Sequence, residues 1–270
     1  MIAPTGQENQ NSRRYITVDG RRLEYKLLEG QSNDAPTIVV LHEGLGSVDL
    51  WKDIPSRLAV SCGCNALVYS RYGNGYSDLL TEARRTDYMH REARVVLPEL
   101  LDKLRVSHPI LFGHSDGGSI ALIHAAMDTS RVLGVVTLAA HVIVEDLTLE
   151  SIRAARTAYQ STDMPTRLSK YHKDADSTFW GWNDIWLHPD FRNWNIESLL
   201  PQIPCPVLAI QGREDEYGTL RQLEILERET PKAELLVLEH CRHSPHRDQP
   251  ASVLSAAHDF IRRASHSSKR

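Results

Sequence analysis

The chain has 270 residues, 41% of them hydrophobic, which is enough to bury the core of one α/β domain with an insertion. Its 31 basic and 35 acidic residues are spread along the chain and give a formal net charge of −4. This balance offers no basic stripe for nucleic acid and no polybasic membrane anchor, so we expect a small-molecule partner.

Cysteine usage and the first residues indicate the compartment. Cys62, Cys64, Cys205 and Cys241 show no zinc-like pairing, and Cys-x-Cys is too tight for an easy disulfide. Residues 1–14 are polar and lack the apolar core of a signal peptide. We therefore expect reduced thiols and a cytoplasmic protein.

Apolar runs alternate with helical patterns along most of the chain. Asp19-Gly20 predicts a hairpin turn between two short strands at an antiparallel edge. The β-branched run 37–41 is typical of a strand buried on both faces of a parallel sheet. The expected strands are 15–18, 22–28, 37–41, 66–69, 109–112, 132–138, 206–210 and 234–238, and the expected helices are 50–60, 87–104, 115–127, 220–229 and 251–263. This alternation predicts parallel βαβ units.

Between residues 141 and 200 the alternation stops, and the chain becomes polar, charged and helical. The segment holds an aromatic cluster: Phe179, Trp180, Trp182, Trp186, Phe191 and Trp194. Because it would leave from the carboxyl edge of the sheet, we expect a cap over the site. The predicted division is a core of 14–140 and 201–264, a cap of 141–200, and flexible tails at 1–13 and 265–270.

The chain is organised around Gly113-His114-Ser115-Asp116-Gly117, which follows an apolar run and precedes a helical pattern. In that context Gly-x-Ser-x-Gly predicts a sharp turn that exposes the Ser115 hydroxyl, because glycine removes the Cβ atoms that would clash. The helix N-terminus adds free N–H groups and a positive partial charge. The pattern favours a nucleophile, although an ordinary helix start with Ser115 as N-cap would have the same sequence pattern.

A serine alcohol needs a base within hydrogen-bond reach, and the base needs a carboxylate to hold its tautomer. Loops 211–216 and 239–250 follow strands that would end at the same sheet edge as Ser115. The acid candidates are Glu214, Asp215 and Glu216, and the base candidates are His240, His243 and His246. The histidine spacing also suggests a metal, but Pro245 would break any helix that aligned these side chains.

Five motifs in this order resemble those of capped α/β-hydrolase-fold serine hydrolases. They are 42–46, the oxyanion loop; 71–77, Arg-x-Gly-x-Gly-x-Ser; 113–117, the nucleophile elbow; 212–215, the acid loop; and 243–250, the terminal histidine motif. The resemblance implies an α/β-hydrolase fold, with a mostly parallel eight-stranded sheet flanked by helices and a small helical cap after the sixth strand. It also implies a triad of Ser115, Asp215 and His243, although some members carry the acid after the preceding strand, here Glu145 or Asp146.

By the same resemblance, the backbone N–H groups of Gly44 and Asp116 form the oxyanion hole. Glu43 departs from the family pattern, which usually has glycine there. A carboxylate beside a developing oxyanion opposes it unless turned away, paired or protonated, and Arg71 or His42 would be its partner. We expect Glu43 to be a buried structural acid; the alternative is a group that binds a substrate amine or positions water.

The cap tryptophans favour an apolar or aromatic acyl group, with Trp180, Trp186 and His141 as candidate pocket residues beside Glu43. At least half of the tryptophans would only attach the cap to the body. We predict a serine hydrolase of a small, partly apolar ester or thioester, acting through an acyl-enzyme without metal or cofactor. C–C bond hydrolysis of ring-cleavage diketones uses the same triad and stays open. A ligand-binding protein on a hydrolase scaffold is the non-enzyme alternative, and the cap is a candidate homodimer surface.

Overall fold

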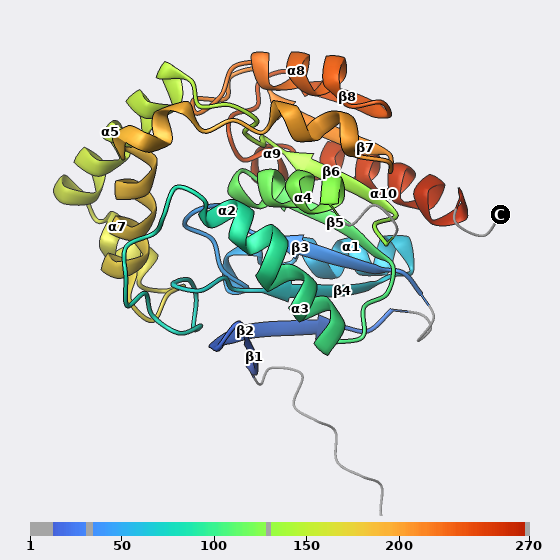
Figure 1. The fold of residues 1–270 in the computed structure, drawn as a ribbon, viewed down its shortest axis with the longest axis horizontal. Helices are drawn as coiled ribbons and strands as arrows, with labels where there is room; N and C mark the ends of the chain where they lie inside the picture. The colour runs from blue at the N-terminus through green and yellow to red at the C-terminus, as the bar shows by residue number, and fades with distance from the viewer. Residues whose placement is uncertain (1–12, 31–34, 128–130, 268–270) are drawn as a thin grey trace, which may run out of the picture.

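The computed structural model describes residues 13–30, 35–127 and 131–267, and its centre is an eight-stranded sheet (Figure 1). The strand order is β1-β2-β4-β3-β5-β6-β7-β8. The strands are β1 (Arg14–Val18), β2 (Arg21–Leu28), β3 (Thr37–Leu41), β4 (Asn65–Tyr69), β5 (Pro109–His114), β6 (Gly134–Leu138), β7 (Val207–Gly212) and β8 (Ala233–Leu238). β2 pairs antiparallel with β1 and β4, and the remaining pairs are parallel. The expected mostly parallel eight-stranded sheet is confirmed.

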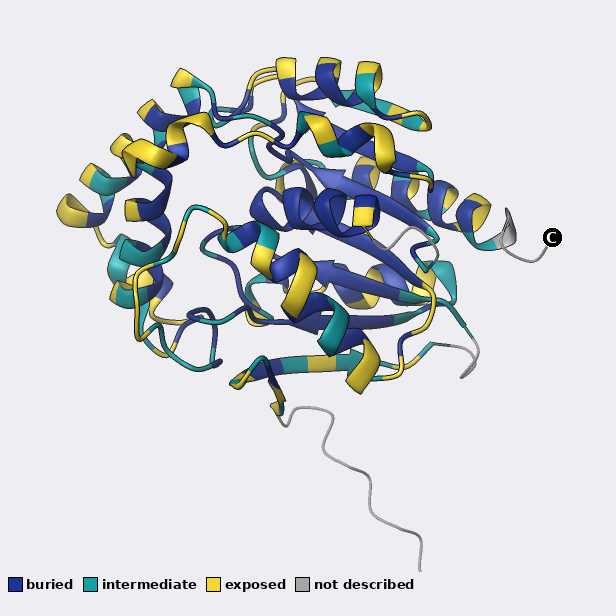
Figure 2. Cartoon of the chain, viewed as in Figure 1, coloured by how far each residue is buried: buried dark blue, intermediate teal, exposed yellow. Residues whose placement is uncertain are grey.

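The sheet is buried because helices cover both of its faces (Figure 2). Successive side chains of a strand point to opposite faces, and β3 shows the consequence. Its Ile38 packs in one core cluster with α1 (Ile54–Cys62) and α10 (Pro250–Ser267). Its Val39 packs in the other with α3 (Leu97–Lys103), α4 (Asp116–Met127) and α8 (Arg221–Glu229). The continuous apolar run is therefore explained by burial on both sides.

The predicted helix 87–104 is one helical stretch with an altered middle. α2 (Tyr88–Arg91) leads into a π-helical turn, η2 (Glu92–Val96), and then into α3. Pro98 has no N–H to donate to the carbonyl four residues back, so the α-helical ladder cannot run unbroken into it. The wider turn buries Glu92, whose carboxylate accepts a hydrogen bond from the Tyr69 hydroxyl at 2.7 Å.

The predicted helix 50–60 also divides, because Lys52 has a positive φ of 54° and ends the short helix η1 (Asp49–Trp51) before α1 begins. At the end of the chain α10 continues to Ser267, so residues 265–267, expected in a flexible tail, are helical. The other expected tail residues, 1–12 and 268–270, lie outside the described part of the chain, while Arg13 is described and its Nε lies 2.9 Å from Glu24.

Five helical segments lie between β6 and β7. They are α5 (Asp146–Ser161), α6 (Met164–Leu168), α7 (Ala175–Trp186), η3 (Pro189–Asn193) and η4 (Glu197–Gln202). α5 and α7 stand together at one end of the sheet, apart from the helices on its faces (Figure 1). Their contact includes stacked rings of Tyr159 and Phe179, whose centroids lie 3.7 Å apart. We refer to these segments as the cap.

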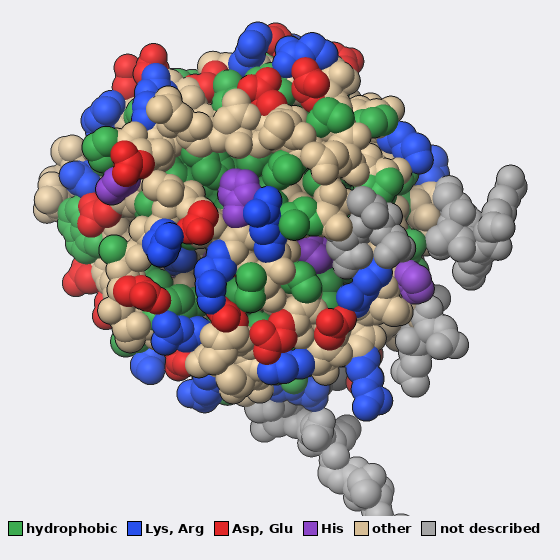
Figure 3. Space-filling model, in the orientation of Figure 1, with side chains coloured by type: hydrophobic (Ala, Val, Ile, Leu, Met, Phe, Trp, Pro, Cys, Tyr) green, Lys and Arg blue, Asp and Glu red, His purple; other side chains and the backbone are tan. Residues whose placement is uncertain are grey.

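Charged side chains of both signs lie among one another on the face shown in Figure 3. Within residues 13–30, 35–127 and 131–267, no helix is both long enough and apolar enough to cross a membrane.

Candidate active site

Ser115 occupies a strained turn between β5 and α4. Its φ is 51°, in the left-handed region that a residue with a side chain rarely adopts. A Cβ atom on Gly113 would clash with the carbonyl of Gly117, and one on Gly117 would clash with the carbonyl of Leu41. The two glycines are therefore needed because backbone segments approach each other closely, and the turn holds the serine at the N-terminus of α4.

His243 lies between Ser115 and Asp215. Its Nε2 is 3.1 Å from Ser115 Oγ, and its Nδ1 is 2.8 Å from Asp215 Oδ1. The Asp215 carboxylate is almost fully buried and also accepts hydrogen bonds from the Tyr217 N–H and the Gln211 amide. The loops after β7 and β8 bring the acid and the histidine to the serine, because parallel strands end at one sheet edge.

Asp215 and a protonated His243 stabilise each other's charge. Burial lowers the pKa of His243, but the neighbouring Asp215 carboxylate raises it above its ordinary value. Burial likewise raises the pKa of Asp215, and the charge and hydrogen bond of His243 bring it below its ordinary value. Asp215 therefore stays ionised, and its charge favours the protonated form of the His243 ring.

The competing residues from the same loops have other contacts. Nδ1 of His240 lies 3.3 Å from the Glu214 carboxylate, and its side chain is 93% exposed. The ring of His246 is buried, with its centroid 4.9 Å from that of Trp51. Glu216 accepts a hydrogen bond from the main-chain N–H of His243 at 3.1 Å, so it holds the backbone of that residue.

The alternative acids after β6 are also engaged elsewhere. Glu145 accepts hydrogen bonds from Thr219 and Gln222. Asp146 pairs with Arg192 at 2.5 Å. None of these partners is Ser115 or His243.

The oxyanion loop is pinned by the loop after β4. Arg71 Nη2 donates to the Glu43 carbonyl at 2.8 Å, and Asn74 Nδ2 donates to the carbonyls of Gly44 and Gly46 at 3.0 and 3.1 Å. A Cβ atom on Gly44 would clash with the indole of Trp182, so α7 of the cap rests directly on this loop. Only glycine fits beneath that ring.

Sequence reasoning missed Trp182 as a site residue, although a signal exists. Trp182 and Trp186 are four residues apart and so share one face of α7, whereas Trp180 lies on another. Helical spacing alone therefore separates the tryptophans that face the core from the one that does not.

Asp116 carries a carboxylate next to Ser115, and this charge is paired. The Tyr88 hydroxyl donates to Asp116 Oδ2 at 2.6 Å, and Arg71 Nη2 lies 3.6 Å from the same oxygen. Burial and the Asp116 charge raise the pKa of Tyr88 well above its ordinary value, so the hydroxyl keeps its proton. Tyr88 is a second residue that the sequence did not point to.

Glu43 is paired with a different residue from those expected. Its carboxylate lies 3.6 Å from His114 Nδ1, and His114 Nε2 donates to the His243 carbonyl at 2.8 Å. Although burial opposes ionisation, His114 brings the pKa of Glu43 well below its ordinary value. The expectation that Arg71 or His42 pairs with this carboxylate is wrong, because both contact the main-chain carbonyl of Glu43 instead.

The rings next to His243 include those of Tyr217 and His141, and Trp186 of the cap packs against His141. The His141 ring lies 5.8 Å from that of His243 and 5.0 Å from that of Trp186, which packs 5.0 Å from Phe191. Burial lowers the pKa of His141 to about 4, so its ring is neutral at pH 7. Nδ1 of His141 and Nε1 of Trp186 are buried without a hydrogen-bond partner among the described residues.

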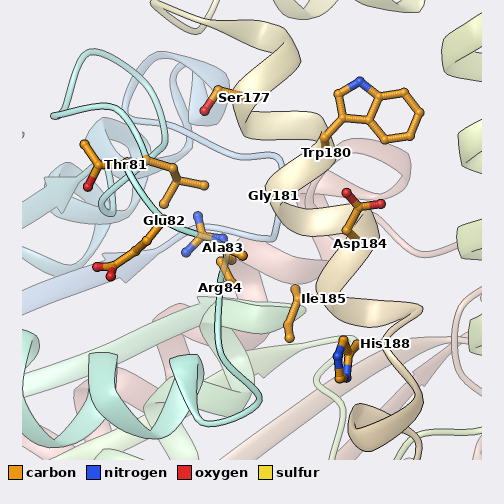
Figure 4. A pocket seen from close by; sticks show the side chains of 11 residues that line it. Thr81, Glu82, Ala83, Arg84, Ser177, Trp180, Gly181, Asp184, Ile185 and His188 are labelled. Carbon is orange, nitrogen blue, oxygen red and sulfur yellow. The ribbon is translucent and has the colours of Figure 1, made fainter.

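Trp180, a predicted pocket residue, lies elsewhere. Its ring packs 5.8 Å from Tyr159, and it lines a cleft of about 380 Å³ between residues 80–84 and α7 (Figure 4). None of the described contacts brings Trp180 to Ser115 or His243. In the part of the chain that the structure describes, no group of three His, Cys, Asp or Glu residues is placed to hold a metal.

A mostly parallel sheet with a serine on a strained strand-to-helix turn defines the fold class as that of the α/β hydrolases. Residues 38–257 match the profile described as "Alpha/beta hydrolase family", so the chain belongs to this family and is a hydrolase.

Individual relatives are distant but cover most of the chain. "Proline iminopeptidase" of Levilactobacillus brevis is 23% identical over 92% of this chain and 97% of its own length. "Serine hydrolase BPHL" of Homo sapiens is 24% identical over 91% of this chain and 85% of its own length. A crystal structure of proline iminopeptidase from Mycobacterium smegmatis superposes with a TM-score of 0.76 at 16% identity, covering 95% of this chain and 100% of that one. At this identity the structural likeness shows the fold.

Proposed function

We propose that the protein hydrolyses a small, partly apolar or aromatic ester or thioester through an acyl-enzyme. The observation that carries this proposal is the hydrogen-bond chain from Ser115 Oγ through His243 to Asp215, at 3.1 and 2.8 Å. A binding protein needs neither a base nor an acid that orients it. The relative named a serine hydrolase supports the same chemistry.

In the first half-reaction, His243 Nε2 takes the proton of Ser115 as Oγ attacks the carbonyl carbon. The backbone N–H groups of Gly44 and Asp116 then stabilise the oxyanion, and loss of one such donor costs about 3 kcal/mol of barrier. His243 gives its proton to the leaving oxygen or sulfur. In the second half-reaction, His243 deprotonates water, which releases the acid from Ser115.

The rings beside His243 supply the acyl site. Neutral His141 lies beside His243 and offers a polar nitrogen without a charge, and the buried rings of Trp186 and Phe191 continue from it as an apolar wall. Such a wall favours an apolar or aromatic acyl group.

An amine-bearing substrate is less well matched than an ester, although two relatives are named proline iminopeptidase. Recognition of a free amine needs an unengaged carboxylate near the nucleophile. Glu43 faces an imidazole, Asp116 accepts a tyrosine hydroxyl, and Glu145 accepts a threonine hydroxyl and a glutamine amide.

The test is a burst experiment with a series of short-chain and aromatic p-nitrophenyl esters. We expect a burst that is stoichiometric with protein, lost in Ser115→Ala and His243→Ala and retained in the exposed controls Ser169→Ala and His188→Ala. A fluorophosphonate should label the parent but not Ser115→Ala. A parent that matches both site variants, or that is not labelled, contradicts the proposal. Turnover of a ring-cleavage diketone or of proline β-naphthylamide without ester turnover contradicts the substrate class.

A further inference from the structure

A cleft of about 690 Å³ lies between the cap and the core, beside the proposed oxyanion hole. On the core side its lining includes Glu43 and Leu45, the two neighbours of Gly44. On the cap side its lining includes Met164 and Leu168 of α6. The cleft therefore begins within one residue of a proposed oxyanion donor.

The segment that follows the catalytic histidine forms a third wall, with His246 and Arg247 of α9 (Pro245–Asp248). The buried ring of His246 lies 4.8 Å from that of His114, which lies 5.2 Å from the ring of His243. In acyl transfer the histidine gives its proton to the leaving group, so the leaving group must lie on the side of the site that the His243 loop borders. The cleft borders this loop at His246 and Arg247, beyond the rings of His114 and His246.

The cleft has an apolar floor and a cationic rim. Its buried floor residues are Trp51, Ile54 and Leu168. Four exposed cations line it, against two carboxylates: Lys52, Arg57, Arg167 and Arg247, against Glu43 and Asp53. The lining therefore has two more cations than carboxylates, and the cations are exposed at the rim.

The ion pairs of the rim cations are weak enough for a bound ligand to replace them. Arg57 lies 3.7 Å from Asp53, and Arg167 lies 3.4 Å from an aspartate four residues earlier, both between exposed side chains. Such pairs are weak, so an incoming anion competes for these cations. Lys52 Nζ donates to the Tyr171 hydroxyl at 2.9 Å and so joins the core to the cap across the cleft.

The charge of this cleft differs from that of the cleft in Figure 4. The lining there includes two carboxylates, Glu82 and Asp184, and one cation, Arg84, so carboxylates outnumber the Lys and Arg side chains of the lining (Figure 4). We therefore expect an anionic group to bind more favourably in the cleft beside the oxyanion loop.

We infer that this cleft binds the leaving group of the substrate, and that its rim selects a leaving group with a phosphate or carboxylate beyond an uncharged linker. The inference rests on the proposed serine-hydrolase function. As Ser115 Oγ bonds to the acyl carbon, the bond from that carbon to the leaving oxygen or sulfur breaks. His243 transfers its proton to that atom, so a neutral hydroxyl or thiol, still bearing its distant anion, leaves through the cleft.

The experiment uses matched substrates with one shared acyl group. One pair compares the coenzyme A thioester with the N-acetylcysteamine thioester, and the other compares the ester of 4-hydroxybenzoate with that of 4-hydroxybenzamide. For the anionic member we expect kcat/KM about tenfold higher at low salt, with the ratio approaching one as salt screens the rim. A response of the thioester pair alone assigns a phosphate, and a response of the aromatic pair assigns a carboxylate.

The double variant Arg167→Gln/Arg247→Gln should bring the ratio from about ten to near one, because each charge pair near 4 Å in water changes binding about fivefold and two such pairs cover the whole preference. The control is Arg228→Gln, an exposed cation of α8 outside the cleft, which should keep the parent ratio. An unchanged ratio in the double variant overturns the inference, and an intact burst and fluorophosphonate label show that the proposed function stands.

Failure of the proposed function gives a different result, since no burst and no label would form with any substrate. The cleft is then tested with free coenzyme A and 4-hydroxybenzoate by calorimetry. Weaker binding of either ligand by the double variant supports an anion site, and equal binding by the two proteins, or none by the parent, overturns it.

Discussion

Two carboxylates flank the proposed oxyanion hole, and the fold gives them different polar neighbours. Glu43 faces the imidazole of His114, at 3.6 Å. Asp116 accepts a hydrogen bond from Tyr88 and lies 3.6 Å from Arg71. A negative charge beside the oxyanion is therefore tolerated on both sides, because each is paired inside the protein.

The partners of the two carboxylates contact different parts of the site. His114 donates to the main-chain carbonyl of His243, so the Glu43 side is connected to the proposed base. Arg71 donates to the carbonyl of Glu43, so the Asp116 side is connected to the loops that shape the oxyanion hole. We expect changes on the Glu43 side to alter catalysis and pH dependence, and changes on the Asp116 side to act mainly on stability.

The largest effect is expected from Arg71→Met. This variant leaves the buried Asp116 carboxylate without its cation and removes a donor to the oxyanion loop. Breaking a buried pair in this way costs about 3–5 kcal/mol of unfolding free energy. Urea denaturation at pH 7 measures it, with Arg213→Met as control because its partner Glu239 is exposed. A loss below about 1 kcal/mol would show that Arg71 is not the main partner of Asp116.

His114→Phe should affect both stability and catalysis. It leaves the carbonyl of His243 without a donor and Glu43 without its imidazole, at a cost of about 1–3 kcal/mol. Because the His243 backbone loses a support, kcat should fall about tenfold or more, as expected when a catalytic group is displaced by a fraction of an ångström. His114→Gln keeps a donor and should recover part of the kcat. Unaltered kcat in His114→Phe would refute the coupling of this side to the base.

Tyr88→Phe is the counterpart on the Asp116 side. It removes a hydrogen bond to a buried carboxylate, so we expect a loss of about 2 kcal/mol in thermal or urea unfolding. In contrast to His114→Phe, kcat should change less than about threefold. A loss of kcat as large as that of His114→Phe would contradict the difference between the two sides.

The smallest effect is a shift of the pH profile in Glu43→Gln. His243 must be neutral to accept a proton, so kcat/KM falls as the pH drops through its raised pKa. Glu43 is among the negative charges that raise this pKa, and the variant should therefore move the acidic limb to lower pH by a fraction of a unit.

The control for this shift is Glu214→Gln, an exposed carboxylate with its oxygen near His240. In Glu214→Gln and in Tyr88→Phe, kcat/KM should fall at the same acidic pH as in the parent protein. A shift of the Glu43→Gln limb to higher pH would contradict the assigned direction.

Much of the sheet and of the site was predictable because it depends on local patterns. The run 37–41 is β-branched and continuous, and such a run is stable only when both faces are covered. The turn at Ser115 is specified by Gly113 and Gly117, since any side chain there meets backbone. The π-helical turn before Pro98 was not predicted. The spacing of apolar residues along one helix face does not reveal that one turn of the helix holds an extra residue.

The sequence by itself determined the strained turn at Ser115, the order of the loops that carry Asp215 and His243, and the glycine-rich loop after β3, because each is set by neighbouring residues. Only the tertiary structure decided the partners of the charged groups. β3 pairs with β5, with Leu41 opposite Gly113, and this register places Glu43 beside His114. Strand order and the docking of the cap depend on contacts between distant parts of the chain, which no local pattern encodes.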